Sequence, residues 1–173
     1  MVRERGTVYL YTGEGGGKTT NALGLALRCL GHDYKVVVIQ FMKWWKNTGE
    51  YKFKKKMPDN YEIYQFGRRG WIGLKNLTEK DKILCKRALN FAKKKAKEKP
   101  RLLVLDEINL ALDSKLLDVK EVLDFLKNVP KETSVVLTGR RAPKELVDFA
   151  DFVNEVVDVK HPDEIPTVRG IQY

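Results

Sequence analysis

The sequence predicts an α/β fold with a mostly parallel central sheet and helices on both faces. Two observations support this. Short apolar runs that are typical of buried strands alternate with longer segments that have helical spacing. Polar clusters also follow three of the predicted strands directly, at the edge of a parallel sheet where ligands bind. The 173 residues contain no Gly/Ser-rich or Pro-rich linker, so we expect a single domain over residues 1–173.

The predicted strands are short and apolar. The clearest is residues 36–41, VVVIQF, a continuous apolar run of the kind that is buried on both faces of a sheet. Residues 62–66 are a weaker candidate. The other predicted strands are residues 8–11, 102–105, 135–137 and 152–157.

The predicted helices lie between these strands, at residues 19–30, 79–98, 119–126 and 143–149. The first is apolar on nearly all sides, so we expect it to be buried. Thr78 and Asp81 form a capping-box pattern at the start of the second. Cys29 and Cys85 lack metal-ligand spacing and fall at apolar helical positions, which indicates small buried side chains.

The chain carries a net charge of +10 and a pI near 9.5. Such a charge suits a polyanionic partner, but it equally suits a Lys/Glu-rich solvated surface, and the charge alone does not decide between them. No apolar run approaches the ~18–20 residues that span a bilayer. The first seven residues lack the apolar stretch of a secretory signal, so we expect a cytoplasmic protein with no membrane contact.

A glycine-rich loop joins the first predicted strand to the first helix. Glycines let the backbone point N–H groups at phosphate oxygens, and the helix adds its positive dipole end. The lysine can reach the phosphates and the next threonine can ligate Mg²⁺. This predicts a P-loop NTPase-like fold that binds a nucleoside triphosphate, with these candidate binding residues: Gly13, Glu14, Gly15, Gly16, Gly17, Lys18, Thr19 and Thr20.

This loop departs from the usual G-x-x-x-x-G-K-[ST] pattern. The pattern requires glycine at position 12, which is Thr12 here, and the first glycine is Gly13. The loop is therefore one residue shorter than usual, and we expect it to hold phosphates differently from an ordinary P-loop NTPase.

Two other polar clusters follow predicted strands. Asp106 and Glu107 follow residues 102–105, where a carboxylate can hold Mg²⁺; a helix N-cap or a surface acid is the alternative. Arg140 can hold a phosphate with two hydrogen bonds, and its alternative is a surface salt bridge. Arg28 lies in an apolar helix and needs a partner, which could be the nucleotide or a neighbouring carboxylate.

Residues 43–57 contain six lysines and four aromatic residues. Such a segment can stack on single-stranded nucleic acid or cover a large planar cofactor. It is equally typical of a mobile, solvated loop.

These motifs, in this order, resemble the P-loop type of ATP:corrinoid adenosyltransferases over residues 6–173. The short loop is the most specific mark. The other matching positions are Ala26 to Arg28, Gly31-His32, Gln40 to Lys43, Gly49-Glu50, Leu105 to Glu107, Thr138 to Arg140, Ala150-Asp151, Lys160-His161 and Gly170 to Tyr173.

The resemblance implies that a Co(I) corrinoid attacks C5′ of ATP, so that the 5′-deoxyadenosyl group moves to cobalt and triphosphate leaves. It implies catalytic roles for Lys18 and Arg140, which would stabilise the leaving triphosphate. Thr19 and Glu107 would be magnesium ligands, with Asp106 nearby, and Arg28 would contact the nucleotide. A homodimer and a reductase that delivers electrons to Co(II) are also implied.

The resemblance further implies that aromatic residues after the third strand, here Phe66 and Trp71, contact the corrinoid. Three positions depart from the family. Gly73 replaces a second aromatic residue, Glu14 replaces a frequent amide, and Gly16 replaces a frequent lysine. The last two changes weaken anion binding. Some members carry an N-terminal segment that closes over the site. Only about six residues precede the first strand here, so we expect that segment to be absent or replaced.

Two alternatives remain. A P-loop ATPase or phosphotransferase that acts on nucleic acid would explain the basic aromatic segment, but not the short loop, and would release ADP or phosphate. A nucleotide-dependent binding module would bind nucleotide without turnover.

Overall fold

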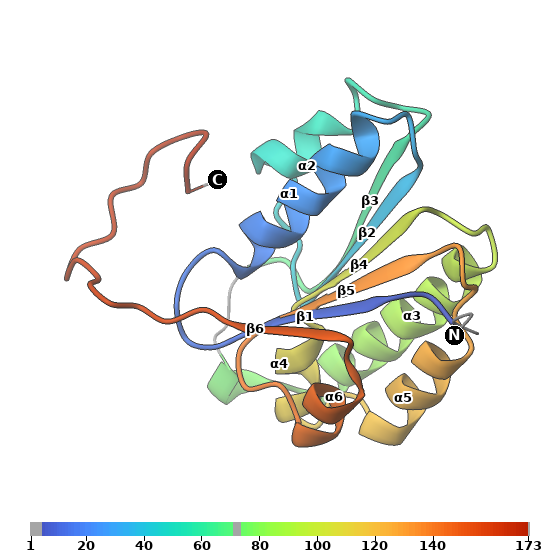
Figure 1. Cartoon of the computed structure of the whole chain (residues 1–173). Coiled ribbons are helices and arrows are strands. Elements are labelled where there is room, and N and C mark those ends of the chain that lie inside the picture. Colours follow the sequence, from blue (N-terminus) through green and yellow to red (C-terminus); the bar gives the residue numbers. More distant parts are fainter. Residues whose placement is uncertain (1–4, 71–73, 173) are drawn as a thin grey trace.

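The computed structural model describes residues 5–70 and 74–172 and confirms the α/β fold (Figure 1). Six strands form one sheet in the order β3-β2-β4-β5-β1-β6, and every pairing is parallel. All six predicted strands are present, with bounds within two residues of the prediction. They are β1 Val8–Thr12, β2 Val36–Phe41, β3 Tyr61–Phe66, β4 Leu102–Asp106, β5 Ser134–Thr138 and β6 Phe152–Glu155.

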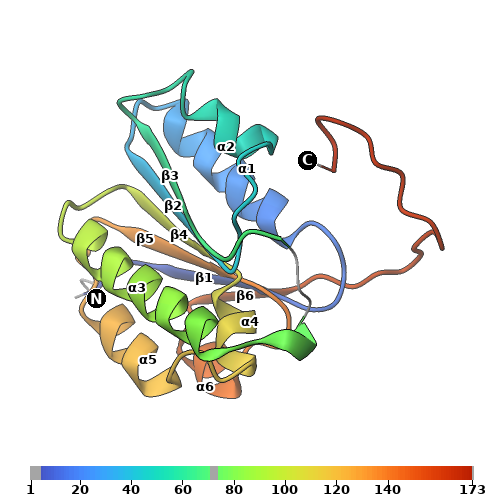
Figure 2. The ribbon, with the colours of Figure 1, turned by 180° about the vertical axis from the view of Figure 1, so that it is seen from behind.

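Helices cover both faces of the sheet. Figures 1 and 2 show α1 (Lys18–Leu30) and α2 (Gly49–Phe53) on one face and the longer α3 (Glu79–Ala96) on the other. Three shorter helices lie on the same face of the sheet as α3. They are α4 Ile108–Asp113, α5 Val119–Lys127 and α6 Lys144–Phe149. A 3₁₀ turn, Leu74–Asn76, precedes α3.

The position of β2 inside the sheet explains why its sequence is apolar except at Gln40. Val37, Ile39 and Phe41 belong to the core cluster under α3, whereas Val36 and Val38 belong to the cluster under α1. Alternate side chains of a strand point to opposite faces, and both faces are covered here, so every position is buried.

The prediction that the first helix is buried because it is apolar on nearly all sides is wrong for much of the helix. Its buried residues are Lys18, Ala22, Ala26 and Leu30, which share i, i+4 spacing and form one stripe. Leu27 is 66% exposed. Leu23 and Leu25 beside this stripe are only partly buried, so the helix is covered on one side. Cys85 is buried as expected, but Cys29 in this helix is only half-buried.

Helix α3 begins as predicted. Thr78 and Asp81 form the capping box, and Arg68 donates two hydrogen bonds to the Asp81 carboxylate, at 2.7 and 2.8 Å. The guanidinium of Arg68 therefore ties the chain after β3 to the start of α3.

The sequence analysis missed α2 and α4. Both are under two turns long, and α4 is almost entirely buried, so neither shows the amphipathic period that identifies a surface helix. Within the described ranges, no helix is long and apolar enough to cross a membrane.

Candidate active site

The glycine-rich loop leaves β1 and packs against the segment that follows β6. Gly13 has φ +95°, and a Cβ there would lie 2.3 Å from the carbonyl oxygen of Val156. Gly15 donates its N–H to that same oxygen at 2.9 Å. Glycine is therefore required at position 13 by both backbone angle and space. Helix α1 begins at Lys18, one residue before the predicted start.

Lys18 is buried and turned back on its own loop. Its ammonium donates to the carbonyl oxygen of Gly15. Burial, and then the positive charge of Arg140, lower the pKa of Lys18 below the ordinary lysine value. A phosphate group beside this ammonium would relieve both effects, since it supplies a negative partner.

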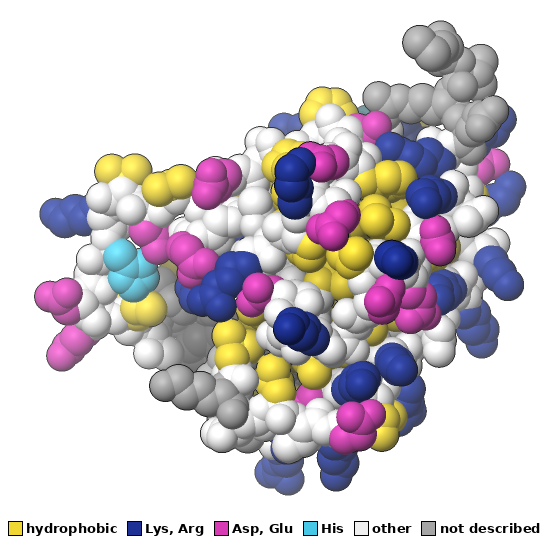
Figure 3. Space-filling view, turned by 90° about the horizontal axis from the view of Figure 1, so that it is seen from below, with side chains coloured by type: hydrophobic (Ala, Val, Ile, Leu, Met, Phe, Trp, Pro, Cys, Tyr) yellow, Lys and Arg dark blue, Asp and Glu magenta, His cyan; other side chains and the backbone are white. Residues whose placement is uncertain are grey.

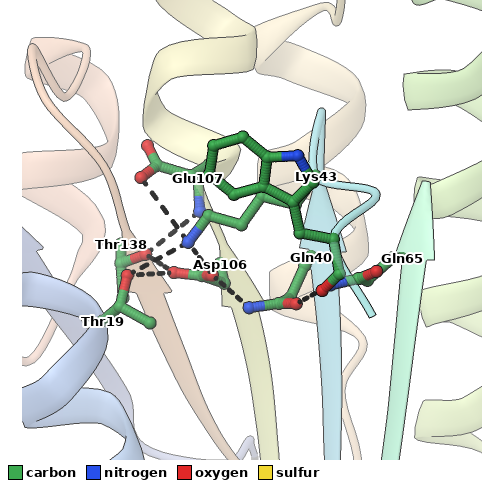
Figure 4. Close-up of polar contacts among 8 residues, drawn as sticks. Thr19, Gln40, Lys43, Gln65, Asp106, Glu107 and Thr138 are labelled. Atoms are coloured by element: carbon green, nitrogen blue, oxygen red, sulfur yellow. Dashed lines mark hydrogen bonds and ion pairs between the residues drawn. The ribbon is translucent and has the colours of Figure 1, made fainter. Parts of the chain in front are cut away.

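The carboxylate of Asp106 is the centre of the polar network at the ends of the strands (Figure 4). It is completely buried at the end of β4. It accepts four hydrogen bonds, from Thr19 Oγ1 at 2.8 Å, Thr138 Oγ1 at 2.7 Å, Gln40 Nε2 at 2.9 Å and Lys43 Nζ at 2.7 Å. Burial raises the pKa of Asp106, but the charge of Lys43 and the hydroxyl donors outweigh it and lower the pKa below the ordinary value.

Glu107 lies beside this network in a left-handed backbone conformation, with φ 65°. Its N–H donates to Thr138 Oγ1 at 3.0 Å, and its carboxylate lies 4.0 Å from Lys43 Nζ. Burial, with the charge of Asp106, raises the pKa of Glu107 above that of an ordinary glutamate. This carboxylate would gain a partner if a cation bound next to it.

Thr19, Asp106 and Glu107 suit a magnesium ion in their chemistry. They offer a hydroxyl and two carboxylates, and Mg²⁺ bound with substrate phosphates usually takes only one or two carboxylates. Thr19 is hydrogen-bonded to Asp106, so the hydroxyl and this carboxylate already converge. The assignment of the three residues as ligands stays a prediction.

Arg140 lies beside the loop, where its partner is Glu14. The Nε atoms of Arg140 and Arg141 lie 3.4 and 3.6 Å from the Glu14 carboxylate. All three side chains are more than half exposed. The residue that departs from the family thus holds the arginine that is predicted to bind phosphate.

Arg28 is separated from Lys18 along α1, although its positive charge reaches Tyr11 of β1 and opposes the rise in the Tyr11 pKa that burial causes. It is exposed in the last turn of α1, ten residues after Lys18, which is about 15 Å along a helix axis. Within the described ranges it makes no hydrogen bond or ion pair. Its predicted contact with the nucleotide stays a prediction.

A cavity of about 470 Å³ opens next to Thr19 and Thr20. Its walls include Trp44, Trp45 and Gln65, and residues 170–172 close one side. Gln65 donates to the carbonyl oxygen of Trp45 at 2.8 Å, which fixes the wall. Part of the basic aromatic segment is therefore a cavity wall.

The two predicted corrinoid contacts differ in what the structure says of them. Phe66 is half-buried and packs against Phe91 of α3, with ring centroids 5.5 Å apart, so it contributes to the core. Trp71 lies outside the described residues, as does Gly73. Both contacts with the corrinoid stay predictions.

The sequence analysis counted Gln40 and Lys43 among the family positions but did not predict that they contact Asp106. Gln40 lies near the end of β2 and Lys43 follows this strand, just as Asp106 ends β4 and Glu107 follows it. The rule that ligands bind at the carboxyl ends of parallel strands covers them equally. A polar Gln40 inside an apolar strand was the available signal.

A family model described as "ATP:corrinoid adenosyltransferase BtuR/CobO/CobP" matches residues 4–173. The chain belongs to this family. Adenosyltransferase relatives match it over nearly its whole length. The corrinoid adenosyltransferase of Sinorhizobium sp. is 35% identical, with 98% of this chain and 81% of the relative covered. The enzyme of that name from Escherichia coli K12 is 33% identical, with 98% and 87% covered.

Among solved structures, the flagellar accessory protein FlaH from Methanocaldococcus jannaschii superposes with a TM-score of 0.56. The identity is 15%, and the superposition covers 88% of this chain and 71% of FlaH. This similarity concerns the fold alone. Together with the sheet order, it agrees with the P-loop NTPase-like architecture that the sequence of this adenosyltransferase-family chain predicts.

Proposed function

We propose that the chain transfers the 5′-deoxyadenosyl group of ATP to the cobalt of a reduced Co(I) corrinoid. The observation that carries this proposal is the match to the adenosyltransferase family over residues 4–173. The short loop with Lys18 and Thr19 at the start of α1 supports it. The new bond joins cobalt, which supplies the electron pair, to C5′ of the ribose. The C5′–O bond breaks, and its electrons leave with the triphosphate.

No protein nucleophile is needed in this reaction, because the corrinoid cobalt attacks. The protein instead positions the two substrates and stabilises the charge of the leaving group. The ammonium of Lys18 and the N–H groups of the loop are the fixed positive groups next to the triphosphate. Arg140 adds to them once it leaves Glu14, which lies 3.4 Å away.

Magnesium would be held by the Thr19 hydroxyl and the carboxylates of Asp106 and Glu107, and would supply positive charge to the triphosphate. Thr138 and Gln40 keep the Asp106 carboxylate in place, at 2.7 and 2.9 Å. Such supporting hydrogen bonds orient a ligand before the metal arrives.

The cavity beside Thr19 and Thr20 gives room for the reacting groups. Its aromatic wall, Trp44 and Trp45, suits a flat ring system. We propose that the adenosine and the edge of the corrinoid meet there. The homodimer, the reductase and the cytoplasmic location that the sequence predicts stay predictions; sedimentation of the purified protein tests the dimer.

The nucleic-acid alternative finds little support on the face seen from below in Figure 3. Lys and Arg side chains there are interspersed with Asp and Glu side chains. A nucleic-acid footprint is typically a continuous basic stripe. On this face the two kinds of charge are mixed, as on a solvated surface.

The test is an anaerobic assay with ATP, magnesium and chemically reduced Co(I) cobalamin. The corrinoid spectrum reports adenosylcobalamin, and the phosphate product is identified separately. We expect adenosylcobalamin and triphosphate in equal amounts. Lys18→Ala should lower turnover by at least about 100-fold, because the triphosphate loses a fixed charge in a buried site.

Lys131→Ala is the matched control. Lys131 is exposed and precedes β5, at the opposite edge of the sheet, so its loss should leave turnover unchanged. Release of ADP or phosphate without corrinoid product would overturn the proposed function. Near-normal turnover in Lys18→Ala would overturn only the role of Lys18.

A further inference from the structure

The Asp106 carboxylate has no free acceptor position in this structure. Its Oδ1 accepts from Thr19 and Thr138, and its Oδ2 accepts from Gln40 and Lys43. A carboxylate offers about four acceptor sites, two on each oxygen. A metal ion can therefore reach Asp106 only if one of these four donors leaves.

Lys43 differs from the other three donors in two ways. It is the charged one, so it repels an incoming cation. Its side chain is also 32% exposed, whereas Gln40 and Thr138 are fully buried. Thr19 is a predicted metal ligand and would stay. Lys43 is thus the donor that a metal can displace with the least rearrangement.

The ammonium of Lys43 lies among the groups that suit the metal. Its Nζ is 2.7 Å from Asp106 Oδ2, 3.4 Å from Thr19 Oγ1 and 4.0 Å from Glu107 Oε1 (Figure 4). One cation therefore contacts the hydroxyl and both carboxylates at once. A lysine side chain is a cation at neutral pH, and here its charge lies against two carboxylates.

The backbone at this position is fixed while the side chain has room to move. Met42, the preceding residue, has φ 57° and donates its N–H to Phe66 at 2.9 Å. Gly67 packs so closely on Met42 that a Cβ there would lie 2.4 Å from the Met42 carbonyl carbon. The cavity of about 470 Å³ borders Lys43 and gives its ammonium a place to go.

We infer that Lys43 is a tethered cation that occupies the magnesium position in the ligand-free protein and is displaced when the metal binds. The inference rests on the magnesium site of the proposed function. If Lys43 occupies this position, the protein binds metal weakly on its own and strongly only when a triphosphate accompanies the metal.

The experiment measures binding of Mn²⁺ alone, without ATP or corrinoid, from the electron paramagnetic resonance signal of the free ion. We expect Lys43→Met to bind Mn²⁺ at least about tenfold more tightly than the unaltered protein, because a competing charge is gone. Its melting temperature should also rise on addition of Mn²⁺, since the metal then neutralises a buried carboxylate.

Lys46→Met is the matched control. It removes the same charge only three residues from Lys43, and Lys46 makes no ion pair in the described part of the chain. Lys43→Gln, which keeps a donor for Asp106, replaces the methionine variant if that one does not fold. If both Lys43 variants bind Mn²⁺ no more tightly than the unaltered protein does, the inference is overturned.

A second variant separates this inference from the proposed metal site. Adding Asp106→Asn to Lys43→Met should abolish the gain in Mn²⁺ affinity. A gain that survives Asp106→Asn would show that Mn²⁺ binds elsewhere, and would overturn the metal site together with the inference. Since the assay contains no corrinoid, neither result depends on adenosyl transfer.

Discussion

At the scale of single residues, Glu14 is the most informative departure from the family. It places a carboxylate inside a loop whose other groups attract anions, and it neutralises Arg140 and Arg141. In the ligand-free protein this carboxylate takes the place of a phosphate charge. If Arg140 binds the triphosphate as we propose, ATP competes with Glu14 for this arginine.

We expect Glu14→Gln to bind Mg-ATP about three- to tenfold more tightly, because a like charge next to the triphosphate is removed. Calorimetric titration at low and high salt measures this, and the gain should shrink at high salt. Glu164→Gln, in the exposed C-terminal segment, is the control. Weaker binding by Glu14→Gln would mean that Glu14 itself holds the ligand.

At the scale of elements, Glu62 joins β3 to its neighbours. Its carboxylate lies 2.7 Å from the Lys35 ammonium, which precedes β2, and 2.6 Å from that of Lys95 in α3. Tyr64 donates a third contact at 2.7 Å. Although burial opposes the charged form, these donors lower the pKa of Glu62 from 4.5 to about 2.

We expect Glu62→Gln to lower the free energy of unfolding by about 1–2 kcal/mol at pH 7. Because folding lowers this pKa, the stabilisation is complete above pH 4.5 and is lost as the pH falls toward 2. Urea unfolding of both proteins at pH 7 and pH 3 measures the difference. An equal difference at both pH values would contradict the role of the charge.

The elements that sequence could predict are those whose environment is simple. Strand β2 is buried on both faces, so its apolar run was unambiguous. The exposure of α1 could not be predicted from its sequence, because tertiary packing decides which apolar stripe contacts the sheet. Helix α4 is short and nearly all buried, so it has no period to detect.

The same limit applies to the site. Lys18, Thr19 and Asp106 were predicted because each belongs to a motif or ends a strand. The contact of Lys43 with Asp106 joins residues 63 positions apart through neighbouring strands. Only the strand order, which the sequence does not state, puts the two side chains together.

At the scale of the whole molecule, the C-terminal segment leaves β6, swings away from the sheet and returns toward α1 and α2 (Figure 1). Its described residues 157–172 are all exposed, yet residues 170–172 line the cavity. We propose that this segment serves ligand binding and adds little to the stability of the fold.

We expect a chain truncated after Pro162 to melt within about 2 °C of the complete chain, because no buried apolar side chain is removed. Its KM for the corrinoid should rise several-fold, since one wall of the cavity is gone. Thermal melting and steady-state kinetics of the two chains measure both effects. A large drop in melting temperature with unchanged KM would contradict this division of roles.

The contact of Val156 with Gly13 and Gly15 also bears on how the protein is made. The nucleotide loop leaves the ribosome early, but the strand end on which it rests follows about 140 residues later. At ordinary rates of translation this interval is on the order of ten seconds. Until Val156 is synthesised, Gly15 lacks this hydrogen-bond acceptor, so we expect the loop to reach its final conformation only late in the synthesis of the chain.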